Sequence, residues 1–546
     1  MTVLEENRRA ERDGTVRRPV PAPPTHADRE MPLSLRLLIV VAAMTGAVLE
    51  VLDSTITATV LPQIQGNLGA TLSEVGWVNT GYLISTVIVL PMAGWLQNRF
   101  GRSRYFAGAI ALFTVSSVLC GLSGSLDSLV FWRVLQGLGG GGLLATGQVI
   151  LMDAFPPEKR GAATALFGVG VTIGPLLGPV AGGWLTDNFS WPWIFFINVP
   201  FGIAAAVMTR LFVPDGVGEA TAEAARKPID YPGVLLLAVG LGSLQAVLER
   251  GEQEDWLESR LIVGLIVAAV IGLSLFVWRE LTTDHPILDL RVLKNRSLTA
   301  GALFGGILGF GLYSTIFLLP VFLQSLRGYT PYESGLVQFP PAILGMVSFM
   351  AAGLLSQKKD PRVLLTIGTT LFILCPWGLS QLTMQTGNPN LYDPLIFRSA
   401  ALGFLFVPLT VASLGDLPPQ DRGAGSGIVN FMRQFGGSVG IATMTTMLDR
   451  QLNYHRAWLV THVNSGNSTV EDWLHGAQGL LLTHGYSTTA GQAGALSLLA
   501  RTVENQAYVL AFNDCFRLVA GVFLLALPIA LLFKRTSGKV DMSEVH

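Results

Sequence analysis

The chain carries little charge for its size. Of its 546 residues only 13% are charged, whereas 50% are hydrophobic. A soluble protein typically has about 25% charged residues, so an ordinary soluble globular class is excluded. The net charge of −1 offers no basic stripe of the kind that nucleic-acid binding requires, and no nucleic-acid partner is expected.

The chain also has few cysteines, and its first residues do not have the pattern of a signal peptide. The three cysteines, Cys120, Cys375 and Cys515, all fall in apolar stretches without disulfide or metal-ligand spacing, and we interpret them as small buried apolar side chains. Residues 1–34 are polar, rich in Arg and Pro, and lack a hydrophobic core. They predict a disordered cytoplasmic tail and not a signal peptide.

Long hydrophobic stretches are what the sequence has in abundance. About 20 apolar residues suffice to cross a bilayer as a helix, and fourteen stretches come close to that length. The sequence therefore predicts an all-α polytopic membrane protein in contact with the lipid bilayer. The predicted spans are 36–61, 74–97, 105–124, 128–152, 161–186, 193–213, 232–249, 260–280, 298–323, 333–355, 363–383, 393–414, 423–447 and 506–533.

Lysine and arginine indicate the orientation of these spans. Cytoplasmic loops carry an excess of both residues, and a count of fourteen places every lysine and the six arginines of the N-terminal tail on one side. On the other side, the connections 62–73, 125–127 and 187–192 contain neither Lys nor Arg. Both termini are therefore expected in the cytoplasm.

An internal repeat predicts how the spans are grouped. Residues 156–162 (PPEKRGA) recur as 418–424 (PPQDRGA), an offset of 262, and two weaker echoes have offsets of 259 and near 266. Two like-oriented six-helix halves are typical of transporters that rock around a central site at mid-membrane. The expected units are a six-helix bundle (35–213), a cytoplasmic linker (214–231), an inserted helix pair (232–280), a cytoplasmic connector (281–297), a second six-helix bundle (298–535) that includes a long hydrophilic outer loop (448–505), and a cytoplasmic tail (536–546).

The first span carries two carboxylates, Glu50 and Asp53, three residues apart on one helix face. Burying a charge in hydrocarbon costs roughly 2.5–3.5 kcal/mol on the insertion scale, so such groups are functional candidates. Desolvation and a like-charged neighbour both favour the neutral form of a carboxyl group. We expect at least one of the two to bind and release a proton near neutral pH; the alternative is that either one only hydrogen-bonds neighbouring helices.

Two arginines, Arg133 and Arg398, lie inside the fourth and twelfth spans. A guanidinium stays charged in the membrane, so each must face a wet cavity, a carboxylate or an anionic substrate. One hypothesis is a relay in which protonation of Asp53 frees Arg133 and biases the bundle to its other state. A fixed structural ion pair is the alternative. Further candidates for the substrate cavity are Gln136, Arg433 and Gln434.

The turn between the second and third spans is basic and contains two glycines. Glycine allows a close turn, and arginines can reach helix C-termini or acidic groups of the other half. Positive-inside anchoring alone would also explain the arginines. We interpret the turn as a cytoplasmic latch formed by Gly94, Asn98, Arg99, Gly101 and Arg102.

A glycine–proline run fills the fifth span. Gly costs about 1 and Pro about 3 kcal/mol in a soluble helix interior, but in a membrane bundle small residues let helices approach closely and neighbours satisfy the backbone groups that Pro frees. The run predicts a tightly packed, bendable helix and consists of Gly170, Gly174, Pro175, Gly178, Pro179, Gly182 and Gly183.

The long outer loop gives weaker signals. Its four histidines are irregularly spaced and no cysteine accompanies them, so no metal site is expected. Segments near 469–482 and 491–505 look amphipathic, which leaves partner docking open. Beyond the loop, Asp514 and Arg517 are expected to pair with each other. The connections contain no nucleophile elbow or phosphate loop, so neither an enzyme nor a bound cofactor is expected.

Several of these motifs together resemble one family, the fourteen-spanner drug:proton antiporters of the major facilitator superfamily. Residues 52–62 (LDSTITATVLP) are similar to its signature in the first span, Arg133-x-x-Gln136-Gly137 to its motif in the fourth, and 170–183 to its antiporter motif. The basic turn and residues 193–202 (WIFFINVPFG) complete a match that covers 36–535. The resemblance implies the major facilitator fold with a 6+2+6 arrangement, and protons as the coupling ion.

The long loop after the thirteenth span is similar to the EmrB-like branch of this family. Its Gram-negative members work with a periplasmic adaptor (a membrane fusion protein) and an outer-membrane channel, so the resemblance implies these partners and a bacterial inner-membrane location. One position departs from the pattern. The family's loop signature usually has Asp where this chain has Asn98, which can cap a helix but carries no charge for a latch salt bridge.

We therefore expect an exporter driven by the proton-motive force that alternates access to a central cavity. Its substrates would be amphipathic compounds such as hydrophobic drugs, uncouplers, aromatic acids or fatty acids. Glu50 would favour cations, whereas Arg133 and Arg398 would favour anions, so the charge of the cargo stays open. A specific exporter of a metabolite or siderophore in the same fold is one alternative; a membrane enzyme or a receptor without transport is the alternative of another class.

Overall fold

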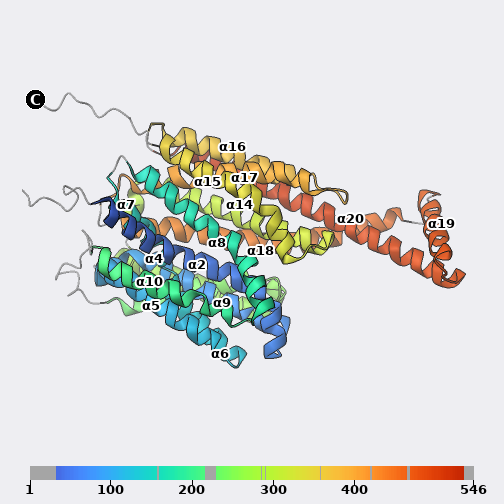
Figure 1. Cartoon of the computed structure of the whole chain (residues 1–546), viewed down its shortest axis with the longest axis horizontal. Coiled ribbons are helices and arrows are strands. Elements are labelled where there is room, and N and C mark those ends of the chain that lie inside the picture. Colours follow the sequence, from blue (N-terminus) through green and yellow to red (C-terminus); the bar gives the residue numbers. More distant parts are fainter. Residues whose placement is uncertain are drawn as a thin grey trace, which may run out of the picture.

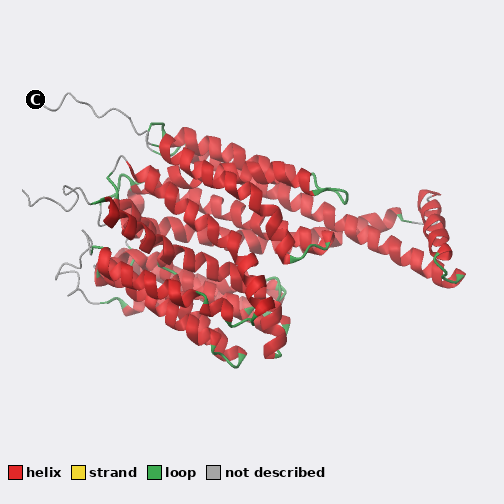
Figure 2. Ribbon diagram, in the orientation of Figure 1, coloured by secondary structure: helices red, strands yellow, loops and turns green. Residues whose placement is uncertain are grey.

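The computed structural model describes residues 32–533, apart from 157–158, 215–228, 284–285, 289, 357, 419–420 and 464–467. Every regular element within these residues is a helix (Figure 2), which confirms the predicted all-α class. Most of the predicted N-terminal tail (1–34) and linker (214–231), and all of the C-terminal tail (536–546), lie outside the described residues.

A helix covers each predicted hydrophobic stretch. The first bundle contains α2 (Leu33–Leu68), α3 (Leu72–Val75), α4 (Trp77–Phe100), α5 (Arg102–Gly121), α6 (Leu126–Gly140), α7 (Leu143–Ala154), α8 (Arg160–Asn188), α9 (Trp193–Phe196) and α10 (Asn198–Phe212). The inserted pair is α12 (Tyr231–Arg250) and α13 (Arg260–Thr282), with the short 3-10 helices η4 (Trp256–Glu258) and η5 (Leu290–Lys294). The second bundle contains α14 (Arg296–Arg327), α15 (Pro331–Leu355), α16 (Pro361–Leu379), α17 (Asn388–Leu414), α18 (Arg422–His462), α19 (Ser468–Thr483), α20 (Thr488–Leu524) and α21 (Ala526–Ala530).

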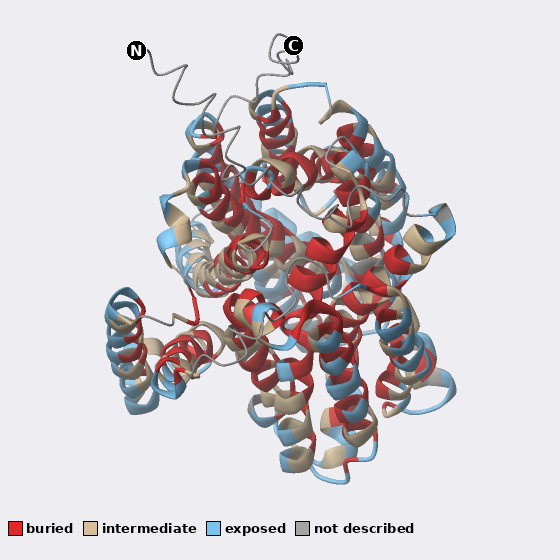
Figure 3. Cartoon of the chain, turned by 90° about the vertical axis from the view of Figure 1, so that its left-hand side faces the viewer, coloured by how far each residue is buried: buried red, intermediate tan, exposed pale blue. Residues whose placement is uncertain are grey.

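The described chain contains twelve helical segments long and apolar enough to cross a membrane. The helices over the fifth and thirteenth predicted spans, α8 and α18, are 29 and 41 residues long and fall outside that set. The molecule is therefore a multi-pass membrane protein by helix length and composition. Its buried residues gather inside the bundle and its exposed ones face outward (Figure 3). The outward apolar side chains are most numerous on α13: Leu261, Val263, Val267, Val270, Ile271, Leu275, Val277 and Trp278.

The segment 448–505, expected as a hydrophilic loop, is largely helical. It contains the end of α18, all of α19 and the beginning of α20. In Figure 1 α18 and α20 run on beyond the other helices, and α19 lies across their far end. The physical reason is that polar composition reports exposure and not backbone conformation, and residues 449–505 contain no proline to interrupt a helix.

Two close helix crossings join the six-helix halves, and the internal repeat relates them to each other. Gly94 of α4 lies against the backbone of Gly423 in α18, and Gly353 of α15 lies against the backbone of Gly161 in α8. Gly94 and Gly353 are 259 residues apart, and Gly161 and Gly423 are 262 apart, as in the repeat. Duplication of the sequence thus produces two equivalent crossings, both at the end of the bundle that carries the predicted cytoplasmic loops.

The glycine–proline run forms a packing surface between α8 and α2. Glycines at every fourth position of α8 face α2, because residues four apart share one face of a helix. A Cβ atom added at Gly178 would lie 2.8 Å from the Cβ of Thr55 and 3.2 Å from the backbone nitrogen of Ile56, whereas one at Gly183 would meet no atom within 4 Å. Pro175 and Pro179 lie inside α8 without ending it. The α2-facing glycines are Gly170, Gly174, Gly178 and Gly182.

The inserted pair fills a position between the two halves. On one side of α12, the Arg250 guanidinium lies 5.0 Å from the centre of the Trp77 ring in α4. On the other, Gln245 donates a hydrogen bond of 2.9 Å to Ser438 of α18. At the opposite end, the Arg279 guanidinium of α13 bonds the carboxylate of Asp230 at 2.8 Å and lowers its pKa. The pair is thus held to both halves rather than standing apart in the lipid.

We predict that Gly178→Ala lowers stability, although Gly→Ala normally favours a helix by about 1 kcal/mol. The added methyl group would overlap Thr55, and overpacking typically costs about 1–3 kcal/mol. The melting temperature of the detergent-solubilised protein measures the effect. Gly183→Ala is the matched control, since its methyl group meets open space. Equal melting temperatures for the two variants would contradict the packing role of the run.

Candidate functional site

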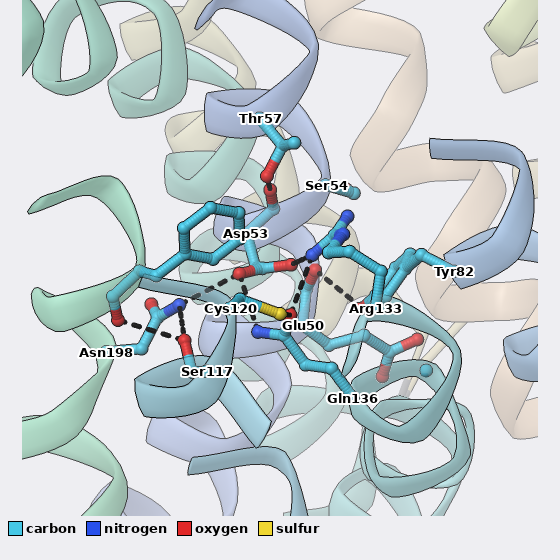
Figure 4. A network of polar contacts seen from close by, with 12 residues as sticks. Glu50, Asp53, Ser54, Thr57, Tyr82, Ser117, Cys120, Arg133, Gln136 and Asn198 are labelled. Atoms are coloured by element: carbon cyan, nitrogen blue, oxygen red, sulfur yellow. Dashed lines mark hydrogen bonds and ion pairs between the residues drawn. The ribbon is translucent and has the colours of Figure 1, made fainter. Parts of the chain in front are cut away.

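A buried ion pair lies inside the first six-helix half. Arg133 of α6 donates from Nη1 to Oδ2 of Asp53 in α2 over 2.5 Å, and both side chains are fully buried (Figure 4). The face of the guanidinium lies 4.2 Å from the centre of the Tyr82 ring. The predicted Asp53–Arg133 pair is thus present. In such a low-dielectric setting, an ionised group without its partner is strongly disfavoured.

Neutral side chains complete the shell around the pair. Oδ1 of Asp53 accepts hydrogen bonds from Nε2 of Gln136 over 2.9 Å and from Nδ2 of Asn198 over 2.8 Å. Oε1 of Gln136 in turn accepts from Nη1 of Arg133 over 2.9 Å. Asn198 also donates to Ser117 over 3.1 Å. Three helices, α2, α6 and α10, therefore meet at one carboxylate, and α5 joins the network through Asn198.

Two buried polar atoms of this network have no partner among the described residues. They are Nη2 of Arg133 and Oδ1 of Asn198. The first is a hydrogen-bond donor and the second an acceptor. The network therefore has unused capacity both to donate and to accept a hydrogen bond beside the Asp53–Arg133 contact.

Glu50 does not join this network, although it lies on the same helix face as Asp53. Its Oε2 accepts a hydrogen bond of 2.8 Å from the backbone nitrogen of Leu144, the second residue of α7. The side chain is 8% exposed, and Figure 4 shows the two carboxyl groups apart. The two carboxylates, expected to act together, therefore have separate partners.

The second half holds two arginines without an ion-pair partner in the described chain. Nη2 of Arg398 donates to Oε1 of Gln338 over 3.1 Å, while its Nη1 is buried and unpaired. The Arg433 guanidinium lies 5.1 Å from the centre of the Phe406 ring. Gln434 accepts a hydrogen bond of 3.2 Å from Tyr313. All three candidates thus contact neutral groups; Arg398 has no counterion among the described residues, whereas Arg433 also interacts electrostatically with Glu50 of the first half.

A charged cluster stands near the predicted latch. Asp153 of α7 accepts from Arg102 over 2.7 Å and from Arg422 of the other half over 2.9 Å. Arg102 was expected to act in the latch, but the carboxylate that it meets was not identified. Asn98 and Arg99 also have partners. The negative charge that joins the halves here comes from Asp153.

A second inter-half contact centres on Gln148 of α7, which sequence reasoning also missed. It donates to Thr410 over 2.9 Å and accepts from Ser426 over 3.2 Å and from Asn430 over 3.1 Å. One signal was available, because Gln148 and Thr410 are 262 residues apart, the offset of the repeat. Residues related by a two-fold axis meet where that axis passes between the halves.

Asp514 of α20 takes part in two further side-chain contacts. The expected pair of Asp514 and Arg517 is present at 3.0 Å. His455, expected in a solvated loop, bonds the same carboxylate at 2.7 Å. This contact ties the extension of α18 to α20, so one of the four histidines has a structural partner that its irregular spacing did not reveal.

Comparison with known proteins identifies the family. A family model described as Major Facilitator Superfamily matches residues 43–441. The chain belongs to this superfamily. Multidrug export protein EmrB of Escherichia coli (strain K12) is 34% identical over 504 residues, covering 92% of this chain and 96% of that protein. The predicted EmrB-like multidrug exporter family is therefore confirmed.

Other relatives of similar sequence identity are named for resistance to different compounds. Fatty acid resistance protein FarB of Neisseria gonorrhoeae is 34% identical over 487 residues, covering 89% of this chain and 94% of that protein. Colistin resistance protein EmrB of Acinetobacter baumannii (strain ATCC 17978) is 32% identical over 514 residues, covering 93% of this chain and 98% of that protein. EmrB-like proteins thus include members named for quite different compounds.

Solved structures support the fold. The human organic anion transporter MFSD10 (TETRAN) superposes with a TM-score of 0.55 at 14% identity, covering 91% of this chain and 99% of that chain. The proton:xylose symporter XylE superposes with a TM-score of 0.52 at 16% identity, covering 93% and 97%. At this identity the likeness concerns the fold alone.

We predict that Arg133→Gln destabilises the protein and that the double variant with Asp53→Asn recovers most of the loss. Removing one partner leaves a buried uncompensated charge, which typically costs about 3–5 kcal/mol, whereas removing both leaves none. Melting temperatures of the two single variants and the double variant form the test cycle. In the control pair Asp514 and Arg517, the arginine side chain is 60% exposed, and Arg517→Gln should cost no more than about 1 kcal/mol. Additive losses in the Asp53–Arg133 cycle would show that the pair is not coupled.

Proposed function

We propose that this EmrB-like protein exports amphipathic toxic compounds across the bacterial inner membrane in exchange for protons. The observation that carries the proposal is the buried contact between Asp53 and Arg133 in the middle of the first half. A carboxylate that can take up a proton, next to a cation that cannot lose its charge, forms a site whose net charge changes with protonation. Protons are then the coupling ion, and no bound cofactor is required.

The topology that we propose is fourteen spans in a 6+2+6 arrangement with both termini in the cytoplasm. Besides the twelve apolar segments, α8 and α18 have 29 and 41 residues and pack among the others. Discontinuous or small-residue helices near a repeat interface are typical of transporter sites. The loops that contain the lysines then lie on the cytoplasmic side, and the extension of α18, α19 and α20 lies outside.

In this orientation the structure corresponds to a state closed on the cytoplasmic side. The contacts of Gln148 with Thr410 and of Asp153 with Arg422 join the halves at that side. Protons from outside would neutralise Asp53, release Arg133 and favour opening toward the cytoplasm. Each inward proton supplies about 2.3 kcal/mol per 100 mV of membrane potential, and alternating access converts this energy into efflux.

The outer helical extension is the region where we propose that a periplasmic adaptor docks, with an outer-membrane channel beyond it. The extension reaches past the rest of the bundle (Figure 1) and exposes large apolar side chains. Apolar side chains exposed outside the membrane are typical of interaction sites. They include Tyr454, Trp458, Trp473, Leu480 and Tyr486.

We predict that Asp53→Asn abolishes proton-driven efflux of a lipophilic cation such as ethidium. Asn keeps the size of the side chain but cannot change its charge, so protonation no longer alters the bond to Arg133. Fluorescence of ethidium in energised inverted vesicles, at set pH gradients, measures transport. The wild type should respond to the gradient and Asp53→Asn should not.

Asp514→Asn is the matched control for this experiment. Its carboxylate is also paired with an arginine, but it lies on α20 near the outer extension, and we expect it to keep gradient-driven efflux. Normal export by Asp53→Asn would place the proton site elsewhere and reject the proposed mechanism.

A specific exporter of anionic amphiphiles, such as aromatic acids or fatty acids, is a second candidate. It is favoured by the two arginines of the second half, Arg398 and Arg433, which have no carboxylate partner in the described residues. The name of one relative, fatty acid resistance protein FarB, agrees with such a cargo. An anionic head group would balance the positive charge of this half.

We predict that Arg398→Gln lowers export of a fluorescent long-chain fatty acid about tenfold and spares ethidium. Loss of one charge-assisted contact of about 1.5 kcal/mol or more produces a change of this size. Initial rates for both probes in the same vesicles measure the selectivity. Arg517→Gln is the control, because that side chain is exposed on α20. Equal losses for both probes would mean that Arg398 supports the fold and not the choice of anions.

A further inference from the structure

We infer that Glu50 is a positioning residue that anchors the start of α7 and thereby controls the contacts between the halves. The inference rests on the proposed proton coupling and adds a route for it. Glu50 would act through a helix end, whereas Asp53 acts through Arg133. Three features of the structure support this assignment: the missing cap of α7, the glycines at its start, and the residues that α7 carries.

The N-terminus of α7 lacks a cap from its own sequence. Its N-cap residue is Gly142, which has no side chain to accept a hydrogen bond from the first turn. A helix start needs such acceptors, because its first N–H groups have no partner within the helix. Glu50, from α2, accepts from Leu144 at 2.8 Å. It is therefore a cap contributed by another helix, and its negative charge suits the positive end of the helix dipole.

The junction between α6 and α7 lies in close contact with neighbouring helices. A Cβ atom at Gly139 would lie 2.6 Å from the backbone nitrogen of Phe113, and one at Gly141 would lie 2.6 Å from the backbone oxygen of Thr86. α5 and α4 thus press on the chain where the predicted fourth span divides. The second piece, α7, is a short helix of 12 residues that follows α6 after only Gly141 and Gly142.

The helix that Glu50 holds carries the polar contacts to the other half. Gln148 and the backbone oxygen of Ala145 both bind α18, through Asn430 and Ser426. At the far end of α7, Asp153 meets Arg422. A helix of 12 residues moves as one rigid piece, so a shift of its start displaces these contacts together.

Four ionisable groups face Glu50 from the surrounding elements. Tyr82 of α4 donates to the backbone oxygen of Glu50 over 3.4 Å, Tyr105 of α5 lies within electrostatic range, and Asp53 follows one turn later on α2. From the other half, Arg433 of α18 acts on Glu50 electrostatically. An ionised Glu50 therefore attracts both the start of α7 and a cation of the second half.

The consequence is a defined direction of coupling. Ionised Glu50 holds α7 where its contacts close the predicted cytoplasmic side. Protonation removes the charge, weakens the bond to Leu144 and the attraction to Arg433, and favours separation of the halves at that side. A proton that arrives from outside would thus help to open the opposite side, as an exporter requires.

The test measures the cytoplasmic distance directly. Spin labels at the exposed residues Arg104 and Lys359, one in each half, report opening by double electron–electron resonance in lipid nanodiscs between pH 5 and 8. In the wild type, the fraction of molecules with the longer distance between the labels should increase as the pH falls. Glu50→Gln should shift the open-to-closed ratio about tenfold toward open at pH 8, within the range usual for coupled sites. Glu50→Asp, which keeps the charge, should restore the pH response.

Two further variants make the result decisive. Glu249→Gln removes a different carboxyl group, bonded to Gln245 on the inserted pair, and should leave the distances unchanged. Asp53→Asn separates this inference from the proposed function. If Asp53→Asn alters the pH response and Glu50→Gln does not, the anchoring role is wrong while proton coupling stands. If ethidium efflux ignores the proton gradient in the wild type, the proposed function itself fails, whatever the distances.

Discussion

The energetic cost of an unpaired charge in the membrane interior is the constraint on which the structure depends. Asp53 and Arg133 satisfy it by pairing at full burial, and the amide groups of Gln136 and Asn198 take up the remaining capacity of the carboxylate. Because the helices that supply these groups must meet at one point, the ion pair also determines how the first half packs. A site that holds a bundle together and can change its charge is suited to couple proton binding to a conformational change of the bundle.

The same constraint acts differently in the second half. Arg398 occupies the place in the repeat that corresponds to Arg133, yet it bonds the neutral Gln338 and not a carboxylate. The second half thus has a cation at this place in the repeat but no carboxylate partner for it among the described residues. The two halves are alike in their crossings, where Gly94 and Gly353 meet equivalent glycines, and unlike in their charge. A transporter with alternating access needs similar helix crossings in both halves for its motion. Proton coupling and substrate selectivity need the difference in charge between the halves.

Much of this arrangement could be predicted from the sequence, for reasons that differ between residues. Asp53 and Arg133 stand out because charge is rare in hydrophobic stretches, and the α8 glycines because their spacing of four matches a helix face. Asp153 and Gln148 carry the contacts between the halves but do not stand out, since each is one polar residue near the end of a span. Residues 448–505 were expected as a hydrophilic loop because composition reports exposure and not backbone conformation, although the amphipathic segments noted near 469–482 and 491–505 coincide with α19 and the start of α20.

Glu50 shows that residues on one helix face can have different partners. Three residues from Asp53, it shares a helix face and was expected to share a role, but a face of α2 is wide enough to meet two different neighbours. One is the buried network around Arg133; the other is the start of α7, where the fourth span divides at Gly141 and Gly142. Neither the break nor the distance from Glu50 to Leu144 can be read from α2 alone. Two neighbouring carboxyl groups on one helix can therefore both bind protons and yet act on different helices.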